Sequence, residues 1–247
     1  MIVKMTVNMI LKMTLKGNNQ KHTTMKTTRF FALLALLMVC AVSCNNSKSI
    51  NGHEYVDLGL PSGTLWATCN IGATMPEEYG DYFAWGETET KDAYNWSSYQ
   101  YCKDSDSTFT KYCCNSEYGN DGYTDTLTIL QDDDDPATAW GVKWHTPSMT
   151  QWEELIQYTT NKWTIQNGVK GMLFTANNGK SLFLPAAGVY SNNWFDETDP
   201  DGGYWSNSLC TDFSNCARGM HFYSEGYAIH CIFRKSGCSV RPVTSLH

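Results

Sequence analysis

The chain has 247 residues, of which 18 are Lys or Arg and 25 are Asp or Glu, and its formal net charge is −7 at pH 7. Nucleic acids and anionic lipid surfaces repel a protein of this charge, because binding to either depends on basic side chains that neutralise phosphates. The composition therefore excludes nucleic acid as a partner.

The first predicted element is a bacterial export signal. From Met25 the sequence has a basic head, then an apolar run over Phe30–Val42, then Ser43 and Cys44. The run is shorter than the ~20 residues that a membrane-spanning helix needs, which indicates a signal and not a permanent anchor. Residues 41–44 resemble a lipobox, which implies that Cys44 is lipidated and becomes the first residue of the mature protein.

The signal divides the chain and predicts its location. Residues 25–43 form the lipoprotein signal, residues 1–24 are interpreted as a misassigned start, residues 44–52 as a linker and residues 53–247 as one domain. Residues 1–43 hold six basic residues and no acid, so their removal lowers the formal charge from −7 to −13. We expect a lipoprotein of the outer membrane or cell surface of a Gram-negative bacterium, facing the exterior or the periplasm.

Short apolar or aromatic runs in the body of the chain predict strands, many of them paired antiparallel. Gly, Asn, Asp and Pro separate these runs, as expected for turns between strands. The predicted strands are Tyr55–Leu58, Leu65–Cys69, Tyr82–Trp85, Gly171–Thr175, Ser181–Pro185, Ala217–Phe222 and Ala228–Phe233.

One main helix is predicted near residues 148–159. Ser148 is suited to cap it, and Gln151 completes a capping box. Apolar residues such as Trp152 and Leu155 follow at helical spacing, so one face is expected to be buried. A smaller helical turn is expected at Met75–Tyr79. With the long irregular loops, these elements predict an α+β fold.

Cysteine usage predicts disulfide bonding, because the chain has 10 Cys and disulfides are the default in an oxidising compartment. Cys102 and Cys113 flank a polar loop, and we predict a disulfide between them. Cys114 is an alternative partner. No Cys-x-x-Cys pair is present, so a zinc-ribbon or thioredoxin-like site has no motif to rest on.

Two other groups of side chains are candidate metal ligands. The run Asp132–Asp135 offers oxygen ligands for calcium, but a charge run in a loop is more often solvated. His145, His221 and His230 lack a helical spacing and nearby clustered carboxylates, which favours solvated or hydrogen-bonded histidines. We therefore predict no metal site and no cofactor, with calcium as the alternative.

The segment 204–243 combines a rigid frame with side chains that have no apolar period. The frame consists of Tyr204, Trp205, Ser206, Ala217, Met220, Phe222, Arg234, Gly237 and Ser239–Val243. Because neighbours alternate along a strand, His221 and Tyr223 face outward if Phe222 faces inward. We predict a ligand-binding surface made of Thr211, Asp212, Phe213, Ser214, Asn215, Gly219, His221, Tyr223, His230, Cys231, Phe233 and Ser236.

Four motifs carry a resemblance to a known family. They are Val56–Ala73, Pro76–Thr88, Trp140–Pro147 and Ser239–Val243, and together they span nearly all of residues 53 to 243. These motifs resemble the fibrobacter-type major paralogous domain of exported bacterial proteins. The resemblance implies a C-type-lectin-like fold, related to that of the formylglycine-generating enzyme.

The segment 204–243 is also similar to the variable region of diversity-generating retroelement target proteins. In that family, randomised template adenines turn Asn codons into any codon ending in C or T. The predicted ligand-binding residues all belong to the amino acids that such codons encode, whereas Glu225 and Lys235 do not. The resemblance implies a diversified surface without a fixed partner. Ordinary divergence between paralogues is the alternative explanation.

Three classes of function compete. A binding module would hold a protein or glycan through exposed aromatic, hydroxyl and charged side chains, the composition of adaptable antibody loops. A structural envelope lipoprotein would need only the fold and the lipid. An oxidase resembling formylglycine generators would need an activated thiolate. The cysteines of this chain, however, do not lie in the Gly-Phe-Arg ending of that family. We therefore predict a membrane-anchored binding protein without enzymatic activity.

Overall fold

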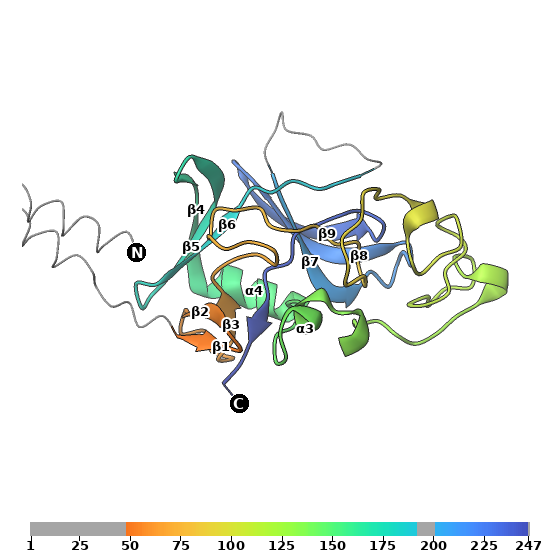
Figure 1. Cartoon of the computed structure of the whole chain (residues 1–247), viewed down its shortest axis with the longest axis horizontal. Helices are drawn as coiled ribbons and strands as arrows, with labels where there is room; N and C mark the ends of the chain where they lie inside the picture. Colours follow the sequence, from red (N-terminus) through yellow and green to blue (C-terminus); the bar gives the residue numbers. More distant parts are fainter. Residues whose placement is uncertain (1–47, 192–200, 247) are drawn as a thin grey trace, which may run out of the picture. The chain divides into compact units, whose positions relative to one another are not determined.

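The computed structural model describes residues 48–191 and 201–246, which belong to one compact unit (Figure 1). The predictions for the signal and for Cys44 lie outside these residues. No helix in the two described ranges is long and apolar enough to cross a membrane. The helices and strands found there are β1 (Ser49–Ile50), β2 (His53–Asp57), β3 (Leu65–Ala67), α3 (Pro136–Trp140), α4 (Met149–Tyr158), β4 (Thr159–Gln166), β5 (Val169–Ala176), β6 (Ser181–Pro185), β7 (Gly202–Leu209), β8 (Cys216–Tyr223), β9 (Gly226–Phe233) and β10 (Val243–Thr244), with short 3-10 helices at Trp96–Ser98, Asn120–Gly122 and Asp132–Asp134.

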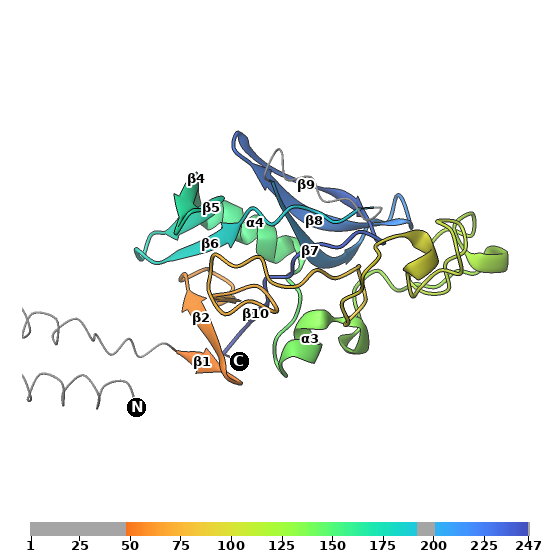
Figure 2. The ribbon, with the colours of Figure 1, turned by 45° about the horizontal axis from the view of Figure 1, so that its top comes forward.

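The strands form antiparallel sheets ordered β1-β2-β3-β10, β4-β5-β6 and β7-β8-β9. The last strand, β10, pairs with β3, so the C-terminal end of the chain returns to the first sheet (Figure 2). The helix α4 packs against both of the other sheets. This arrangement confirms the predicted α+β class.

The elements with the clearest sequence signals are confirmed. Ser148 caps α4 by accepting a hydrogen bond from the Gln151 amide, and the Gln151 side chain accepts one from the Ser148 amide. Trp152 and Leu155 of α4 are fully buried. Every predicted strand other than Tyr82–Trp85 coincides with a strand of the structure.

Two local predictions are wrong. In Tyr82–Trp85 only Phe83 forms a β-bridge, with Cys238, and the segment is otherwise irregular. Residues 75–79 form a turn and not a helix. The Glu78 amide donates to the Met75 carbonyl oxygen (3.1 Å), and the Glu78 carboxylate accepts hydrogen bonds from the amides of Thr74 (2.7 Å) and Met75 (3.1 Å), so the segment makes a single capped turn.

The strand β7 is not among the predicted strands, although Tyr204, Trp205 and Ser206 belong to the predicted frame. The structure gives a reason for the two glycines at its start. A Cβ atom at Gly202 would lie 2.1 Å from the Phe222 ring, and one at Gly203 would lie 2.2 Å from the Val189 side chain. Close packing against neighbouring segments therefore requires glycine at the start of β7.

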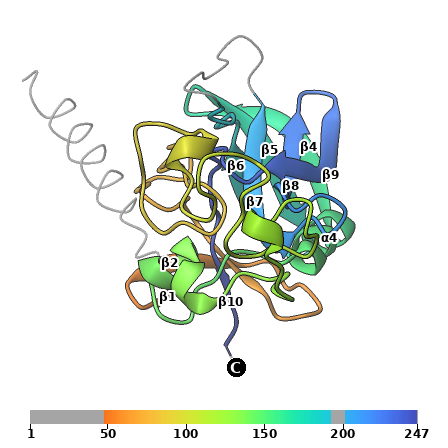
Figure 3. The ribbon, with the colours of Figure 1, turned by 90° about the vertical axis from the view of Figure 1, so that its right-hand side faces the viewer.

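The predicted frame of the C-terminal segment is confirmed, since all of its members are buried. Tyr204, Met220 and Phe222 join α4 and β5 in one hydrophobic cluster. Trp205 belongs to a second cluster, which also includes Phe109 and Tyr112 from the long loops. Figure 3 brings these loops, residues 91–135, to the front of the view. The sheet β7–β9 therefore rests on packed side chains on both sides.

The predicted disulfide is wrong. Cys102 and Cys113 are free thiols, and the structure instead joins Cys210 to Cys231, with their Cα atoms 6.0 Å apart. The Cys102 thiol donates to the Trp96 carbonyl, whereas the Cys113 thiol donates to the Asn115 carbonyl. Each thiol therefore has its own acceptor, and closeness in the sequence does not bring the two sulfurs together.

The acidic run Asp132–Asp135 is only partly solvated, which corrects the prediction. Asp134 is buried, and its carboxylate accepts hydrogen bonds from Lys111 (2.5 Å), from Tyr101 (2.6 Å) and from Tyr112. The Lys111 ammonium and the two hydroxyls hold the pKa of Asp134 below its usual value, against the effect of burial. Protein donors thus occupy the Asp134 carboxylate, whereas Asp132 and Asp133 are exposed.

Candidate ligand-binding site

The predicted ligand-binding residues do not form one surface. In the β8–β9 hairpin, Cys216 pairs with Phe233 and Gly219 pairs with His230. Directly opposite residues share a face of a sheet, and successive residues alternate between faces. His221, Tyr223 and His230 therefore share one face, whereas Phe233 belongs to the other face.

The two groups also lie at opposite ends of the hairpin. Tyr223 pairs with Gly226 at the turn, and Phe233 pairs with Cys216 at the other end of the eight-residue strands. At ~3.3 Å per residue, this separation is roughly 20 Å. We name two patches: the histidine patch (Asp201, His221, Tyr223 and His230) and the loop patch (Thr211, Asp212, Phe213, Asn215 and Phe233).

Three of the predicted contact residues are buried, which excludes them from either patch. They are Ser214, Gly219 and Ser236. A Cβ atom at Gly219 would lie 2.8 Å from both the Ile232 side chain and the Tyr204 carbonyl oxygen, so this position requires glycine for packing. Cys231 is half-buried and is bonded to Cys210, so its role is structural.

The histidine patch is held together by its own side chains. The Nε2 atom of His221 lies 2.6 Å from Oδ2 of Asp201. The His221 ring stacks on the His230 ring, with 5.0 Å between centroids, and lies 6.0 Å from the Tyr223 ring. Burial, and then the neighbouring His221, lower the pKa of His230. Tyr223 and His230 are exposed, whereas His221 and Asp201 are half-buried.

The loop patch presents apolar rings on a fixed support. Phe213 is 53 % exposed and Phe233 is 48 % exposed. The Cys216 amide donates to the Phe213 carbonyl oxygen (2.9 Å), and Cys216 pairs with Phe233 in the sheet, so the backbones of both phenylalanines adjoin this residue. The Cys210–Cys231 disulfide ties the start of the loop to β9.

The buried side chain of Arg234 holds the backbone of the loop patch in place. Arg234 is fully buried, and its guanidinium donates to the carbonyl oxygens of Ser214 and Tyr112 (2.9 Å each) and of Lys111 (3.0 Å). It also lies 4.4 Å from the centroid of the Phe109 ring. Arg234 therefore joins the loop 210–216 to the segment 111–114, two segments that are about 100 residues apart in sequence.

The segment 111–114 contributes a side chain that the sequence analysis did not assign to the surface. The exposed thiol of Cys114 lies 3.5 Å from the Thr211 carbonyl oxygen and 3.4 Å from the Ser214 hydroxyl. Asn215 similarly donates to Asp106 (3.3 Å). Such contacts between distant segments have no signal in a single sequence.

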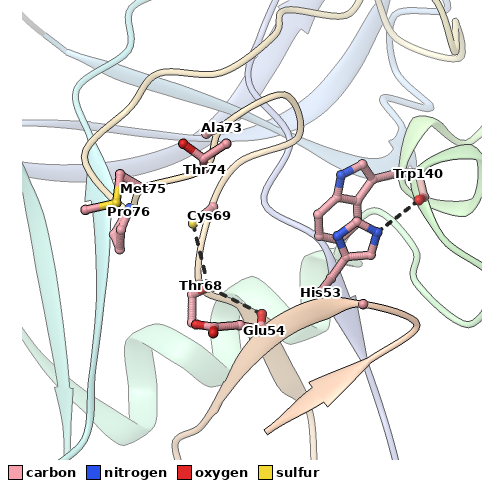
Figure 4. Close-up of a pocket in the computed structure, with 10 residues that line it drawn as sticks. His53, Glu54, Thr68, Cys69, Ala73, Thr74, Met75, Pro76 and Trp140 are labelled. Atoms are coloured by element: carbon pink, nitrogen blue, oxygen red, sulfur yellow. Dashed lines mark hydrogen bonds between the residues drawn. The ribbon is translucent and has the colours of Figure 1, made fainter. Parts of the chain in front are cut away.

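A cavity of about 450 Å³ lies elsewhere, next to β2 (Figure 4). On one side the His53 and Trp140 rings stack, with 3.4 Å between centroids, and Met75 and Pro76 lie on the other side. The free thiol of Cys69 lines it, and burial raises the pKa of this thiol. The cavity contains none of the predicted ligand-binding residues, so it is a separate feature.

Within residues 48–191 and 201–246, no three His, Cys, Asp or Glu side chains are grouped to hold a metal ion. Comparison with known proteins gives no match: no family model fits the sequence, and no curated protein or solved structure is similar to it. The function is therefore inferred from the residues of this chain alone.

Proposed function

We propose that the protein is an exported ligand-binding module and that the loop patch is its centre of contact. The observation that carries this proposal is the exposure of Phe213 and Phe233 on a support fixed by a disulfide and by Arg234. Binding energy in interfaces concentrates in a few aromatic or charged anchors. A support that is already ordered also lowers the entropy cost of binding.

The chemistry of the loop patch favours a protein partner over a glycan. Phenylalanine rings have no hydrogen-bonding group and gain free energy by leaving water, so their natural complement is an apolar pocket. Asp212 and Thr211 beside them supply the polar rim that typically surrounds such anchors. The diversified surface that the retroelement resemblance implies is consistent with exposed side chains on a buried frame.

The remaining parts of the proposal concern fold family and anchoring. Short antiparallel strands, one main helix, long loops and a C-terminal strand paired with β3 support a C-type-lectin-like fold. The residues of the family motifs include the buried Trp66, Trp85 and Arg241, as expected for a framework. The export signal supports lipidation at Cys44, which would hold the module at the membrane.

An oxidase function has less support, because burial favours the protonated form of three of the free thiols. Burial raises the pKa of Cys102 and of Cys216 to about 11, and raises that of Cys238 well above its ordinary value. An activated thiolate needs a lowered pKa. A purely structural envelope role would not require exposed phenylalanines on a fixed loop.

Photo-crosslinking on intact cells tests the proposal. Phe213 is replaced by a photoreactive phenylalanine analogue, and Ile165, which is 63 % exposed on β4, receives the same analogue as a control. We expect a defined protein adduct from position 213 and none from position 165. An adduct of sugar mass would assign a glycan, and equal adducts from both positions would contradict the loop patch as the contact centre.

A further inference from the structure

The strand β9 has β8 on one side, and its other edge is open. β9 is the last strand in the sheet order β7-β8-β9. In the described part of the chain, no segment other than β8 forms a backbone hydrogen bond or a β-bridge with residues 227–232. The outer edge of β7, in contrast, is covered, because the Trp205 amide donates to the Ser239 carbonyl oxygen and the Ser239 amide donates to the Gly203 carbonyl oxygen (3.1 Å each).

The bonding pattern of the β8–β9 hairpin identifies the backbone groups at the open edge. In an antiparallel pair, opposite residues alternate between those that bond each other and those whose N–H and C=O groups point away. The Arg234 amide donates to the Asn215 carbonyl oxygen (3.0 Å), so the adjoining pair of Cys216 and Phe233 is of the second kind. The other β9 residues in the same phase are Tyr227, Ile229 and Cys231. Their N–H and C=O groups therefore point to the open edge.

β9 also lacks the features that keep edge strands from pairing with other chains, which include charged residues, proline and short length. Its eight residues contain no charged residue and no proline. Among the described strands, β4 is as long but carries the exposed Lys162, and β6 ends in Pro185. The edge strands of the first sheet, β1 and β10, have 2 residues each. β9 is therefore the edge best suited to pair with another strand.

We propose that β9 pairs with β9 of a second copy of this chain, antiparallel and around a twofold axis at Ile229. In this register Ile229 lies opposite Ile229 of the second copy, and Tyr227 lies opposite Cys231 of the second copy. All the outward N–H and C=O groups of these three residues then form hydrogen bonds across the axis. A twofold contact of this kind is closed, so it produces a dimer and no larger assembly.

Two observations favour a second copy over a foreign peptide. First, β9 has no charged side chain, so two copies meet along it without opposing like charges, although the whole chain has a formal net charge of −7. Second, β8 and the Cys210–Cys231 disulfide already hold β9 extended. A second copy therefore loses little conformational entropy on pairing, whereas a free peptide must first be ordered.

Amide hydrogen exchange of the full chain in detergent, at high and at low protein concentration, tests this pairing residue by residue. The β9 amides that bond to β8 should be protected at both concentrations. The outward amides of Tyr227, Ile229 and Cys231 should become protected, by about tenfold or more, only at high concentration. Sedimentation equilibrium in density-matched detergent should show a reversible equilibrium between monomer and dimer.

A matched pair of proline variants tests the edge itself. Tyr227→Pro removes an outward N–H and no bond to β8, and should weaken the dimer about tenfold or more. Ile165→Pro is the control on β4. Ile165 pairs with Lys170, whose carbonyl oxygen accepts from the Ala186 amide (2.9 Å) on the far side, so the Ile165 N–H also points away from its neighbouring strand. This variant should change the dissociation constant by less than about twofold.

His230→Lys covers the case in which proline unfolds the strand. His230 is exposed, and lysines at this position in the two copies would lie within about one Debye length of each other. Their repulsion should weaken the dimer about fivefold, although the change makes the net charge less negative. A dimer as strong as that of the wild-type chain would contradict the proposed register.

Several results would overturn the proposal. A chain that stays monomeric with unprotected outward amides has no such contact, and protection at every concentration would show that the edge is covered within one chain. Protection of a monomer only after a cell-envelope extract is added would assign the edge to a foreign strand. Equal weakening by the two proline variants, or assembly beyond a dimer, would also contradict it.

The dimer goes beyond the proposed function, because it uses the backbone of β9 and not the rings of the loop patch. Phe213→Ala should therefore leave the monomer–dimer equilibrium unchanged. Loss of loop-patch binding with a retained dimer, or loss of the dimer with retained binding, separates the two proposals.

Discussion

The two ends of the β8–β9 hairpin differ in how their exposed side chains are held. At one end, the loop 210–216 is fixed by the Cys210–Cys231 disulfide and by the buried Arg234. At the other end, His221 is held by two neighbouring side chains, Asp201 and His230. A surface that is already ordered pays less entropy on binding. The comparison therefore favours the loop patch as the contact centre.

The largest expected loss of stability comes from a change in the buried core that supports both ends of the β8–β9 hairpin. Trp205 is 1 % exposed, and its indole nitrogen donates to the Phe83 carbonyl oxygen (2.6 Å). Trp205→Ala should lower the free energy of unfolding by about 3–5 kcal/mol, because it leaves a large cavity. Thermal melts measure this loss. A loss below about 1 kcal/mol would show that the stability of the sheet does not depend on the buried Trp205 side chain.

The disulfide should matter next, and only at the loop-patch end. Cys231→Ser removes a cross-link between residues 21 positions apart, which the loop-entropy relation values at about 3 kcal/mol. Urea unfolding under non-reducing conditions measures the change. Cys114→Ser is the matched control, since its thiol is free and exposed, and should shift stability by no more than about 0.5 kcal/mol. Equal losses of stability in Cys231→Ser and Cys114→Ser would show that Cys231 does not form the disulfide.

At the histidine-patch end we expect a small pH effect. The folded-state pKa of His230 is lowered, so the folded protein binds this proton less readily than the unfolded chain. The contribution of His230 is therefore present above the unfolded pKa of about 6.5 and is lost as pH falls below it. Because the His230 ring is only partly buried and the residue as a whole remains exposed, the change should stay below about 1 kcal/mol.

Unfolding free energies at pH 7.5 and pH 5 check this, with His230→Gln as the comparison. The variant should lose less stability on acidification than the wild-type protein does. Identical pH dependence in the two proteins would mean that the histidine stack has no effect on stability, and would sharpen the contrast between the two ends further.

The sequence predicts local features of the fold well. The capping box of Ser148 and Gln151 depends on residues three positions apart, and the apolar run of β6 is short and bounded by turn residues. In contrast, β7 starts with Gly202 and Gly203, whose packing partners Phe222 and Val189 lie elsewhere in the chain. No local pattern identifies such a strand, because tertiary contacts define it.

The candidate site was predictable in composition but not in arrangement. Alternation along β8 correctly placed His221 and Tyr223 on the face opposite to Phe222. The position of Phe233 depends on which residue of β8 it pairs with, and a sequence does not specify that register. The position of Cys231 opposite Arg218 depends on the same register, so the Cys210–Cys231 disulfide has no local signal in the sequence.

The most direct test compares the two ends through binding. Phe213→Ala and Phe233→Ala are paired with Tyr223→Ala, a truncation of an aromatic side chain that is 37 % exposed in the histidine patch. Binding of the full chain to whole cells and to a glycan array is measured beside thermal melts. We expect all three variants to stay within about 0.5 kcal/mol of wild-type stability, and only the two phenylalanine variants to lose binding, by about tenfold or more. Loss of binding in Tyr223→Ala alone, or unfolding of the phenylalanine variants to the extent expected for Trp205→Ala, would contradict the account.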